Sequence, residues 1–216
     1  MIGLMRQDVS HKTIAVLGAT GATGRHVVAL ALRSGHGVVA LVRRAGSFAP
    51  AVGLRETVWP DITDRETLTS ALRGVDVVIS TLGGAEKGPT SVCTDAMRTT
   101  IPAMGAAGVP RLIAVSAHGV LDSRDRSLYS MAVWSAVPDR MRDKETMEPL
   151  VVGSSVDWTI VRPPMLRDTG ATGRYRVGED LPIKLWQSIG RADLAAFLVG
   201  EAVEARFARR YPRIHR

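Results

Sequence analysis

Three glycines at positions 18, 21 and 24 follow a short apolar run, Ile14 to Leu17, and directly precede a helical pattern of apolar residues. A helix that begins at such a turn presents the free N–H groups of its first turn to an anion. Gly18 lets the chain turn off the strand, Gly21 leaves room for a phosphate, and Gly24 lets the helix pack close to the sheet. The spacing therefore predicts a site for the pyrophosphate of a dinucleotide.

The remaining residues of this turn belong to the same predicted site. Thr20 and Thr23 offer hydroxyl donors, and Ala22 lies between them at the start of the helix. Glycine-rich turns also end strands for steric reasons alone. This turn, however, follows the first strand of a βαβ unit, which favours cofactor binding. Its G-x-x-G-x-x-G spacing indicates an atypical branch of the Rossmann dehydrogenases.

Two arginines, Arg43 and Arg44, close the second expected strand, at residues 38–42. An acidic residue about 20 positions past the glycines takes the ribose 2′-hydroxyl of NAD, whereas arginine accommodates the 2′-phosphate of NADP. No Asp or Glu occurs from Leu41 to Arg55. The sequence therefore predicts NADP(H) as the cofactor. The alternative is that the arginines are only surface charge.

The ends of the next two expected strands supply further cofactor contacts. Asp61 and Ile62 follow the strand expected at residues 54–59 and should lie beside the adenine. Leu82 and Gly83 follow the fourth strand, and their backbone is expected near the ribose or nicotinamide, because the carboxyl ends of parallel strands border the cofactor crevice. A plain turn explains the glycine equally well.

Candidate catalytic residues follow the fifth expected strand, at residues 111–116. Ser116 could hydrogen-bond the substrate or the nicotinamide, and His118, with an ordinary pKa of about 6.5, is the best local proton donor. Lys144, on a helix expected at residues 139–153, could approach the nicotinamide ribose. The alternatives are a serine that satisfies the strand end, a solvent-exposed histidine and a lysine on an ordinary charged surface. Trp134 and Met165 could flank a planar substrate or simply fill the core.

Strand-like apolar runs alternate with helical patterns along the chain, which implies right-handed crossovers and a parallel sheet. The expected fold is α/β, a Rossmann-like doubly wound parallel sheet in one domain, residues 12–205, with a small C-terminal substrate-side appendage. Residues 120–136 show no clear period and are expected to form a substrate-side loop. We expect a loose leader at residues 1–11 and a solvated basic tail at residues 206–216.

Composition restricts the partners of the protein. The chain has 216 residues, of which 45% are hydrophobic and only 5% aromatic. This composition indicates a core of aliphatic side chains, which suits buried parallel strands.

The net charge of +7 suits an anionic cofactor and substrate, and no helix-turn-helix or zinc-finger spacing supports nucleic acid. No apolar run approaches the roughly 18 residues of a membrane span. We expect a cytoplasmic protein without a metal site, because the five histidines and single cysteine show no ligand spacing.

Several motifs in this order resemble the atypical short-chain dehydrogenase/reductase group with NmrA-like NAD(P)-binding domains, and within it the flavin reductase / biliverdin-IXβ reductase type. They are GATGATG at 18–24, LVRR at 41–44, PDITD at 60–64, VVISTLGG at 77–84, RLIAVSAHG at 111–119, RDKETME at 142–148, VDWTIVRPP at 156–164 and GRADLA at 190–195. The likeness covers roughly residues 12 to 205.

The resemblance implies NADPH on the glycine turn and Arg43, and a shallow substrate site over the nicotinamide. Its walls would be residues 116–119, the 120–136 segment, Lys144 and Met165. Three substrate-side residues depart from the family: Ala117 replaces a hydroxyl residue, and Lys144 and Met165 stand where the reductases have histidines. These departures bear on a tetrapyrrole substrate in particular.

The Tyr-x-x-x-Lys acid of ordinary short-chain dehydrogenases is missing. Each tyrosine is followed four positions later by another residue: Val133 after Tyr129, Glu179 after Tyr175 and His215 after Tyr211. Hydride donation to an acceptor that delocalises charge, such as a flavin or quinone, needs no protein acid of this kind. The predicted function is an NADPH-dependent oxidoreductase with a planar or conjugated small-molecule substrate. The alternatives are an NmrA-like redox sensor without turnover and a natural-product tailoring reductase, and the oligomeric state stays open.

Overall fold

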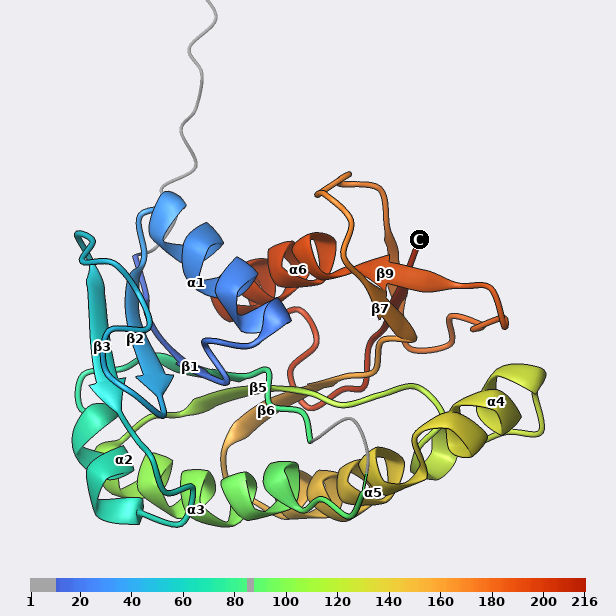
Figure 1. The fold of residues 1–216 in the computed structure, drawn as a ribbon, viewed down its shortest axis with the longest axis horizontal. Coiled ribbons are helices and arrows are strands. Elements are labelled where there is room, and N and C mark those ends of the chain that lie inside the picture. Colours follow the sequence, from blue (N-terminus) through green and yellow to red (C-terminus); the bar gives the residue numbers. More distant parts are fainter. Residues whose placement is uncertain (1–10, 85–87) are drawn as a thin grey trace, which may run out of the picture.

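A six-stranded parallel sheet, in the order β3-β2-β1-β4-β5-β6, forms the central layer of the protein (Figure 1). The structure is a computed structural model, and it describes residues 11–84 and 88–216. The strands are β1 (Thr13–Leu17), β2 (Gly37–Val42), β3 (Leu54–Val58), β4 (Val77–Ser80), β5 (Arg111–Val115) and β6 (Asp157–Val161). The strand order reverses between β1 and β4, which is where doubly wound sheets bind ligands. The expected Rossmann-like fold is confirmed.

Helices cover both faces of the sheet (Figure 1). On one face lie α1 (Ala22–Arg33) and α6 (Arg191–Glu204), and on the other α2 (Arg65–Ala71), α3 (Val92–Ala107) and α5 (Pro138–Val152). Side chains of β1 alternate between the two resulting cores: Ile14 packs with α1 and α6, while Leu17 packs with α2, α3 and α5. No helix of the described ranges is long and apolar enough to cross a membrane.

Residues 120–136 do not form the expected loop. They form a short 3₁₀ turn, η1 (Leu121–Ser123), and a helix, α4 (Leu128–Ala136). Ser127 starts α4, since its side-chain oxygen accepts a hydrogen bond from the Ser130 N–H at 3.2 Å. Only Tyr129 and Ser130 of this helix are buried. Its sequence therefore lacks the apolar period that would have indicated a helix.

The basic C-terminal segment is not a solvated tail, and that expectation is wrong. Arg210 O accepts a hydrogen bond from the Ile160 N–H at 3.1 Å, and Pro212 O accepts one from the Arg162 N–H at 2.9 Å. The chain then forms β10 (Arg213–His215), in which Ile214 is fully buried. Backbone hydrogen bonds to the edge strand β6 and to the residue after it hold this segment against the sheet despite its charge. Residues 1–10, most of the expected leader, lie outside the described residues.

Two small sheets make up the expected C-terminal appendage. One pairs β7 (Met165–Arg167) with β9 (Ser188–Gly190), and the other pairs β8 (Arg176–Gly178) with β10. The loop before β8 is anchored by the buried Asp193, whose carboxylate accepts hydrogen bonds from the backbone N–H groups of Thr172 and Gly173 at 2.8 and 2.9 Å.

A buried arginine holds the 3₁₀ turn, α5 and the C-terminal segment together. Arg162 is 1% exposed and donates through Nε and Nη2 to the two carboxylate oxygens of Glu148, at 3.2 and 2.6 Å. Its Nη2 also lies 2.7 Å from Asp122 Oδ1, and its guanidinium carbon lies 4.2 Å from the centre of the Tyr211 ring. This bidentate pair fixes the residues that follow β5 and β6 relative to each other.

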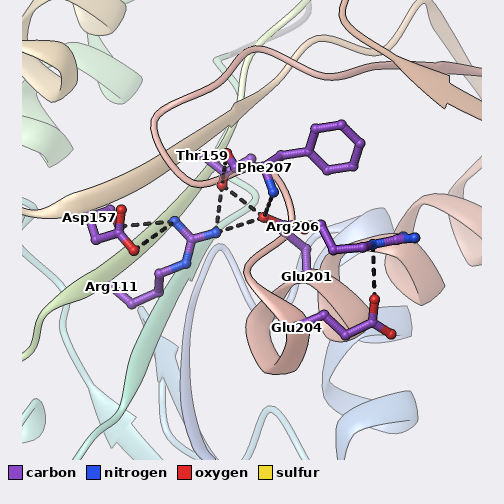
Figure 2. A network of polar contacts seen from close by, with 7 residues as sticks. All are labelled: Arg111, Asp157, Thr159, Glu201, Glu204, Arg206 and Phe207. Carbon is purple, nitrogen blue, oxygen red and sulfur yellow. Dashed lines mark hydrogen bonds and ion pairs between the residues drawn. The ribbon is translucent and has the colours of Figure 1, made fainter.

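A second buried ion pair ties α6 to strands β5 and β6 (Figure 2). Arg111 Nη2 donates to Glu201 Oε1 at 2.8 Å and to the Thr159 hydroxyl oxygen at 2.5 Å. Glu201 Oε1 also accepts from the Phe207 N–H at 2.9 Å. The network thus orders the chain where α6 ends and the C-terminal segment begins.

The two glutamates near the end of α6 should differ sharply in their effect on stability. Glu201→Ala leaves the buried Arg111 guanidinium with only the partly exposed Asp157 carboxylate, at 3.9 Å, as an acid partner, and should lower the free energy of unfolding by about 3 kcal/mol. Glu204 pairs with Arg206 at the surface, so Glu204→Ala should change it by less than about 1 kcal/mol. Urea unfolding measures both, and equal effects would contradict the assignment.

Candidate functional site

A cleft of about 850 Å³ lies at the carboxyl ends of β1, β2 and β4. The structure brings eight of the predicted cofactor-binding residues together in its wall: Gly18, Thr20, Gly21, Arg43, Asp61, Ile62, Leu82 and Gly83. Trp59, Thr81 and Val92 also line it and were missed, because nothing in their sequence setting distinguishes them from core residues. The cleft joins segments that lie up to 74 positions apart, from Gly18 to Val92.

The glycine turn has the geometry that the spacing predicts. Gly18 has a φ of +75°, which favours glycine, and an added Cβ there would lie 3.2 Å from the Leu82 backbone nitrogen. A Cβ on Gly24 would lie 2.1 Å from Gly18 O, so the helix packs against the turn more closely than any side chain allows. Gly21 is exposed, with an extended backbone at the N-cap of α1 and no side-chain cap. Its position leaves the first-turn N–H groups open to an anion.

Not every predicted residue of the turn lines the cleft. Ala22 is exposed at the first helical position, whereas Thr23 and Gly24 are buried. Thr23 is 8% exposed. Gly24 has the packing role that the spacing predicts. The side chains of Ala22 and Thr23 therefore do not form part of the cleft wall.

One end of the cleft is positively charged. Arg43 lines it, and no described residue forms a hydrogen bond or ion pair with its guanidinium. Arg44 is exposed and lies outside the cleft wall. Asp61 Oδ1 accepts hydrogen bonds from the backbone N–H and hydroxyl of Thr63 at 2.8 and 2.7 Å, which lowers the pKa of Asp61. Its orientation is thus set by the turn before α2.

Lys144 and Ser116 lie outside the cleft wall, and Lys144 reaches the ends of β4 and β5. Its Nζ donates to Leu82 O at 3.0 Å and to Val115 O at 2.6 Å, and the residue is 8% exposed. It is therefore not part of an ordinary charged helix surface. Ser116, also buried, has a hydroxyl without a hydrogen-bond partner among the described residues. A buried hydroxyl without a partner is unusual in a folded protein and marks this strand end as a candidate contact for a ligand.

The residue before Lys144 explains how this lysine is positioned. The buried Asp143 carboxylate accepts hydrogen bonds from the backbone N–H groups of Cys93 and Thr94, both at 2.9 Å, and so caps α3 from α5. A carboxylate at a helix N-terminus is favoured by the free N–H groups there. Burial raises the pKa of the neighbouring Cys93 thiol. No local sequence pattern indicates this contact, because its partners lie about 50 positions apart.

His118 is not the solvent-exposed side chain that a loop position favours. It is 1% exposed, and its ring lies 5.4 Å from the Tyr129 ring. Burial, together with the positive charge of Arg213, lowers the pKa of His118 to about 4. Burial also raises the pKa of Tyr129 to about 12. Neither group is suited to exchange a proton with a substrate near neutral pH.

The predicted substrate residues lie outside the cleft wall, near the segments that follow β5 and β6. Trp134 donates from its indole N–H to Gly119 O at 2.8 Å, and the Arg124 guanidinium stacks 3.7 Å from the ring centre. Met165 is 48% exposed on β7, and Ala117 is half-buried. No group of three or more histidine, cysteine, aspartate or glutamate residues within the described ranges could hold a metal ion.

A family model described as NAD(P)H-binding matches residues 18–204. The chain belongs to this NAD(P)H-binding family. Membership confirms a nicotinamide cofactor and agrees with the glycine turn at the head of the cleft.

Solved structures and curated sequences agree with this assignment. The structure of ChuY, an anaerobilin reductase from Escherichia coli O157:H7, has a TM-score of 0.79 and 27% identity, over 94% of this chain and 96% of that one. Oxidoreductase ylbE from Lactococcus lactis has a TM-score of 0.83 at 19% identity, over 94% and 90% of the two chains, and shows the fold alone.

Two curated relatives are longer proteins. Photosystem II assembly factor Ycf39 of Synechocystis sp. is 31% identical over 88% of this chain and 58% of its own length. An isoflavone reductase homologue of Zea mays, IRL, is 38% identical over 39% of this chain and 30% of its own length. The chain thus spans less than two thirds of these relatives. It is a member of an oxidoreductase family, with reductases among its relatives.

Two glycine substitutions should separate cofactor binding from folding. Gly21→Val places a branched side chain over the exposed first-turn N–H groups and should weaken NAD(P)H binding at least about tenfold, with the unfolding midpoint little changed. Gly24→Ala places a Cβ in steric conflict with the Gly18 carbonyl oxygen and should lower the free energy of unfolding by about 1–3 kcal/mol. Nicotinamide fluorescence and thermal unfolding measure the two effects. Unchanged binding in Gly21→Val would refute the pyrophosphate site.

His118 should make folding stability depend on pH. Its pKa of about 4 lies below the ordinary value of 6.5, so the unfolded chain binds more protons between these two values. Stability from this group is therefore full above about pH 6.5 and is lost as the pH falls toward about 4. The free energy of unfolding, measured with urea, should fall less for His118→Gln than for the wild type as the pH is lowered from about 6.5 to about 4. His26→Gln, an exposed position on α1, serves as the control, and parallel curves for His118→Gln and wild type would contradict the assignment.

Proposed function

We propose that this protein is an NADPH-dependent reductase that passes hydride to a flavin, a quinone or a similar conjugated acceptor. The observation that carries the proposal is the cleft with the glycine turn at its head and the unpaired Arg43 guanidinium in its wall. A free arginine at the end of the second strand suits a 2′-phosphate, which only NADP carries.

The residues of the cleft divide between the parts of the cofactor. The first-turn N–H groups of α1 and the Thr20 hydroxyl bind the pyrophosphate, and Arg43 and Arg44 bind the 2′-phosphate. The adenine lies between Asp61 and Ile62. Bound NADPH supplies the hydride.

The nicotinamide end of the site is assigned to a second group of residues. The backbone of Leu82 and Gly83 borders the nicotinamide ribose. Lys144 holds Leu82 O and Val115 O in place and directs its remaining N–H toward the ribose. The free Ser116 hydroxyl orients the nicotinamide or the substrate.

Among the described residues, neither His118 nor Tyr129 is a suitable acid, which favours a charge-delocalising acceptor. The pKa values of His118 and Tyr129, about 4 and about 12, leave both unable to exchange protons near neutrality. Hydride transfer to a conjugated ring system spreads the resulting charge, and water then supplies the proton. We assign Ala117, Trp134 and Met165 to the wall that receives a planar substrate. The reductase activity named for ChuY is consistent with this class of chemistry.

A second candidate is a sensor that binds NADP(H) without turnover. The missing Tyr-x-x-x-Lys acid favours it, as does the likeness to Ycf39, which is named for assembly of photosystem II rather than for a reaction. NADPH absorbance, followed with FMN, FAD and a simple quinone in turn, distinguishes the two. Turnover with one of these acceptors supports the reductase. Tight NADPH binding without turnover supports the sensor and overturns the reductase.

Reversing the charge of Arg43 should change the cofactor preference. Arg43→Glu removes the 2′-phosphate partner and adds a repulsive charge, so NADPH affinity should fall by about tenfold or more while NADH affinity changes little. Arg73→Glu, an exposed position after α2 with the same change in charge, should leave both affinities near wild type. Fluorescence titration with each cofactor gives the ratio of the NADPH affinity to the NADH affinity. A wild-type ratio in Arg43→Glu would rule out the 2′-phosphate role.

A further inference from the structure

The loop between β2 and β3 carries both arginines of the proposed 2′-phosphate site and is fastened from two sides. Arg43 and Arg44 begin the loop, which continues to Gly53 before the chain enters β3. A loop of this length orders its side chains only if other parts of the fold hold it. Two charged side chains, Glu56 and Arg25, do so.

Glu56, from β3, holds the loop by accepting hydrogen bonds from two backbone N–H groups of the loop. Its Oε1 accepts a hydrogen bond from the Gly46 N–H at 2.6 Å, and its Oε2 accepts one from the Phe48 N–H at 2.9 Å. Both carboxylate oxygens are thus used by the backbone. Glu56 is the first acidic residue after the glycine turn, and these bonds hold it in the loop instead of leaving it free for a ribose hydroxyl.

Arg25, from the first turn of α1, holds the loop by donating a hydrogen bond to one of the loop's backbone carbonyl oxygens. Its Nη1 donates to Ser47 O at 3.4 Å, while its Nε donates to Thr20 O of the glycine turn at 3.2 Å. Its guanidinium carbon lies 5.2 Å from the centre of the Phe48 ring. The side chain therefore bridges the pyrophosphate turn and the arginine loop, and no acidic residue of the described chain pairs with it.

We propose that Arg25 is a positioning residue for the 2′-phosphate of NADP. By bonding Thr20 O and Ser47 O at once, it fixes the arginine loop against the glycine turn and so holds Arg43 in the cleft wall. It thereby sets the preference for NADPH over NADH. This inference rests on the proposed use of NADPH.

The planar fork of arginine is essential to this role. Nε and Nη1 point in different directions from one rigid group, so one side chain bonds two carbonyls of separate segments. A lysine at this position keeps the charge but has a single nitrogen on a flexible stem. Loss of the bridge and loss of the charge are therefore separable by substitution.

The test compares Arg25→Met, Arg25→Lys and the matched control Arg33→Met, which removes a charge from the exposed last turn of the same helix. Calorimetric titration with adenosine 2′,5′-bisphosphate and with 5′-AMP, which differs from it only by the missing 2′-phosphate, gives the preference for the 2′-phosphate. We expect both Arg25 variants to lose about fivefold to tenfold of this preference, and Arg33→Met to keep it. Affinity for 5′-AMP should stay within about twofold, because that ligand lacks the phosphate that the arginine loop would bind.

The outcomes separate this inference from the proposed function. A wild-type protein without preference for the 2′-phosphate overturns both. A wild-type protein with the preference, together with an Arg25→Met variant that retains it, overturns only the role of Arg25. Full preference in Arg25→Lys shows that charge alone matters and also overturns the bridge. Thermal unfolding of each variant confirms that the comparison is made on folded protein.

Discussion

The contact between Gly24 and Gly18 O is the constraint on which the binding end of the molecule depends. A Cβ at Gly24 would lie 2.1 Å from that oxygen, so helix α1 can approach the strand end only without a side chain there. The close approach places the first turn of α1 at the head of the cleft, with its N–H groups open at the exposed Gly21. Arg25 follows Gly24 directly and is therefore brought within reach of the arginine loop.

The opposite end of the cleft is organised by two consecutive residues of α5. Asp143 caps α3, and Lys144 binds the backbone oxygens of Leu82 and Val115. One helix thus fixes the start of another and the ends of two strands. Because the lysine uses backbone carbonyls rather than an acid partner, its charge is not neutralised by an ion pair with a described residue, which suits a site for an anionic cofactor.

Buried ion pairs order the segments outside the central sheet. Arg162 joins Glu148 and Asp122, and Arg111 joins Glu201 and Thr159. Such pairs contribute little net stability compared with apolar packing, yet losing one partner is costly, because a buried charge is left without its partner. Their value here is geometric: they fix the 3₁₀ turn and the C-terminal segment relative to the sheet.

The sequence by itself determined the parallel sheet, the glycine turn and eight of the residues at the cleft, because strand periodicity and glycine spacing are local properties of the chain. Gly24 and Arg43 lie where their spacing predicts. Only the tertiary structure decided the rest: that His118 is buried, that the last residues extend the sheet edge, and that residues 128–136 form a helix. Each of these depends on contacts between residues far apart in the chain, whose desolvation and hydrogen bonding no local pattern records.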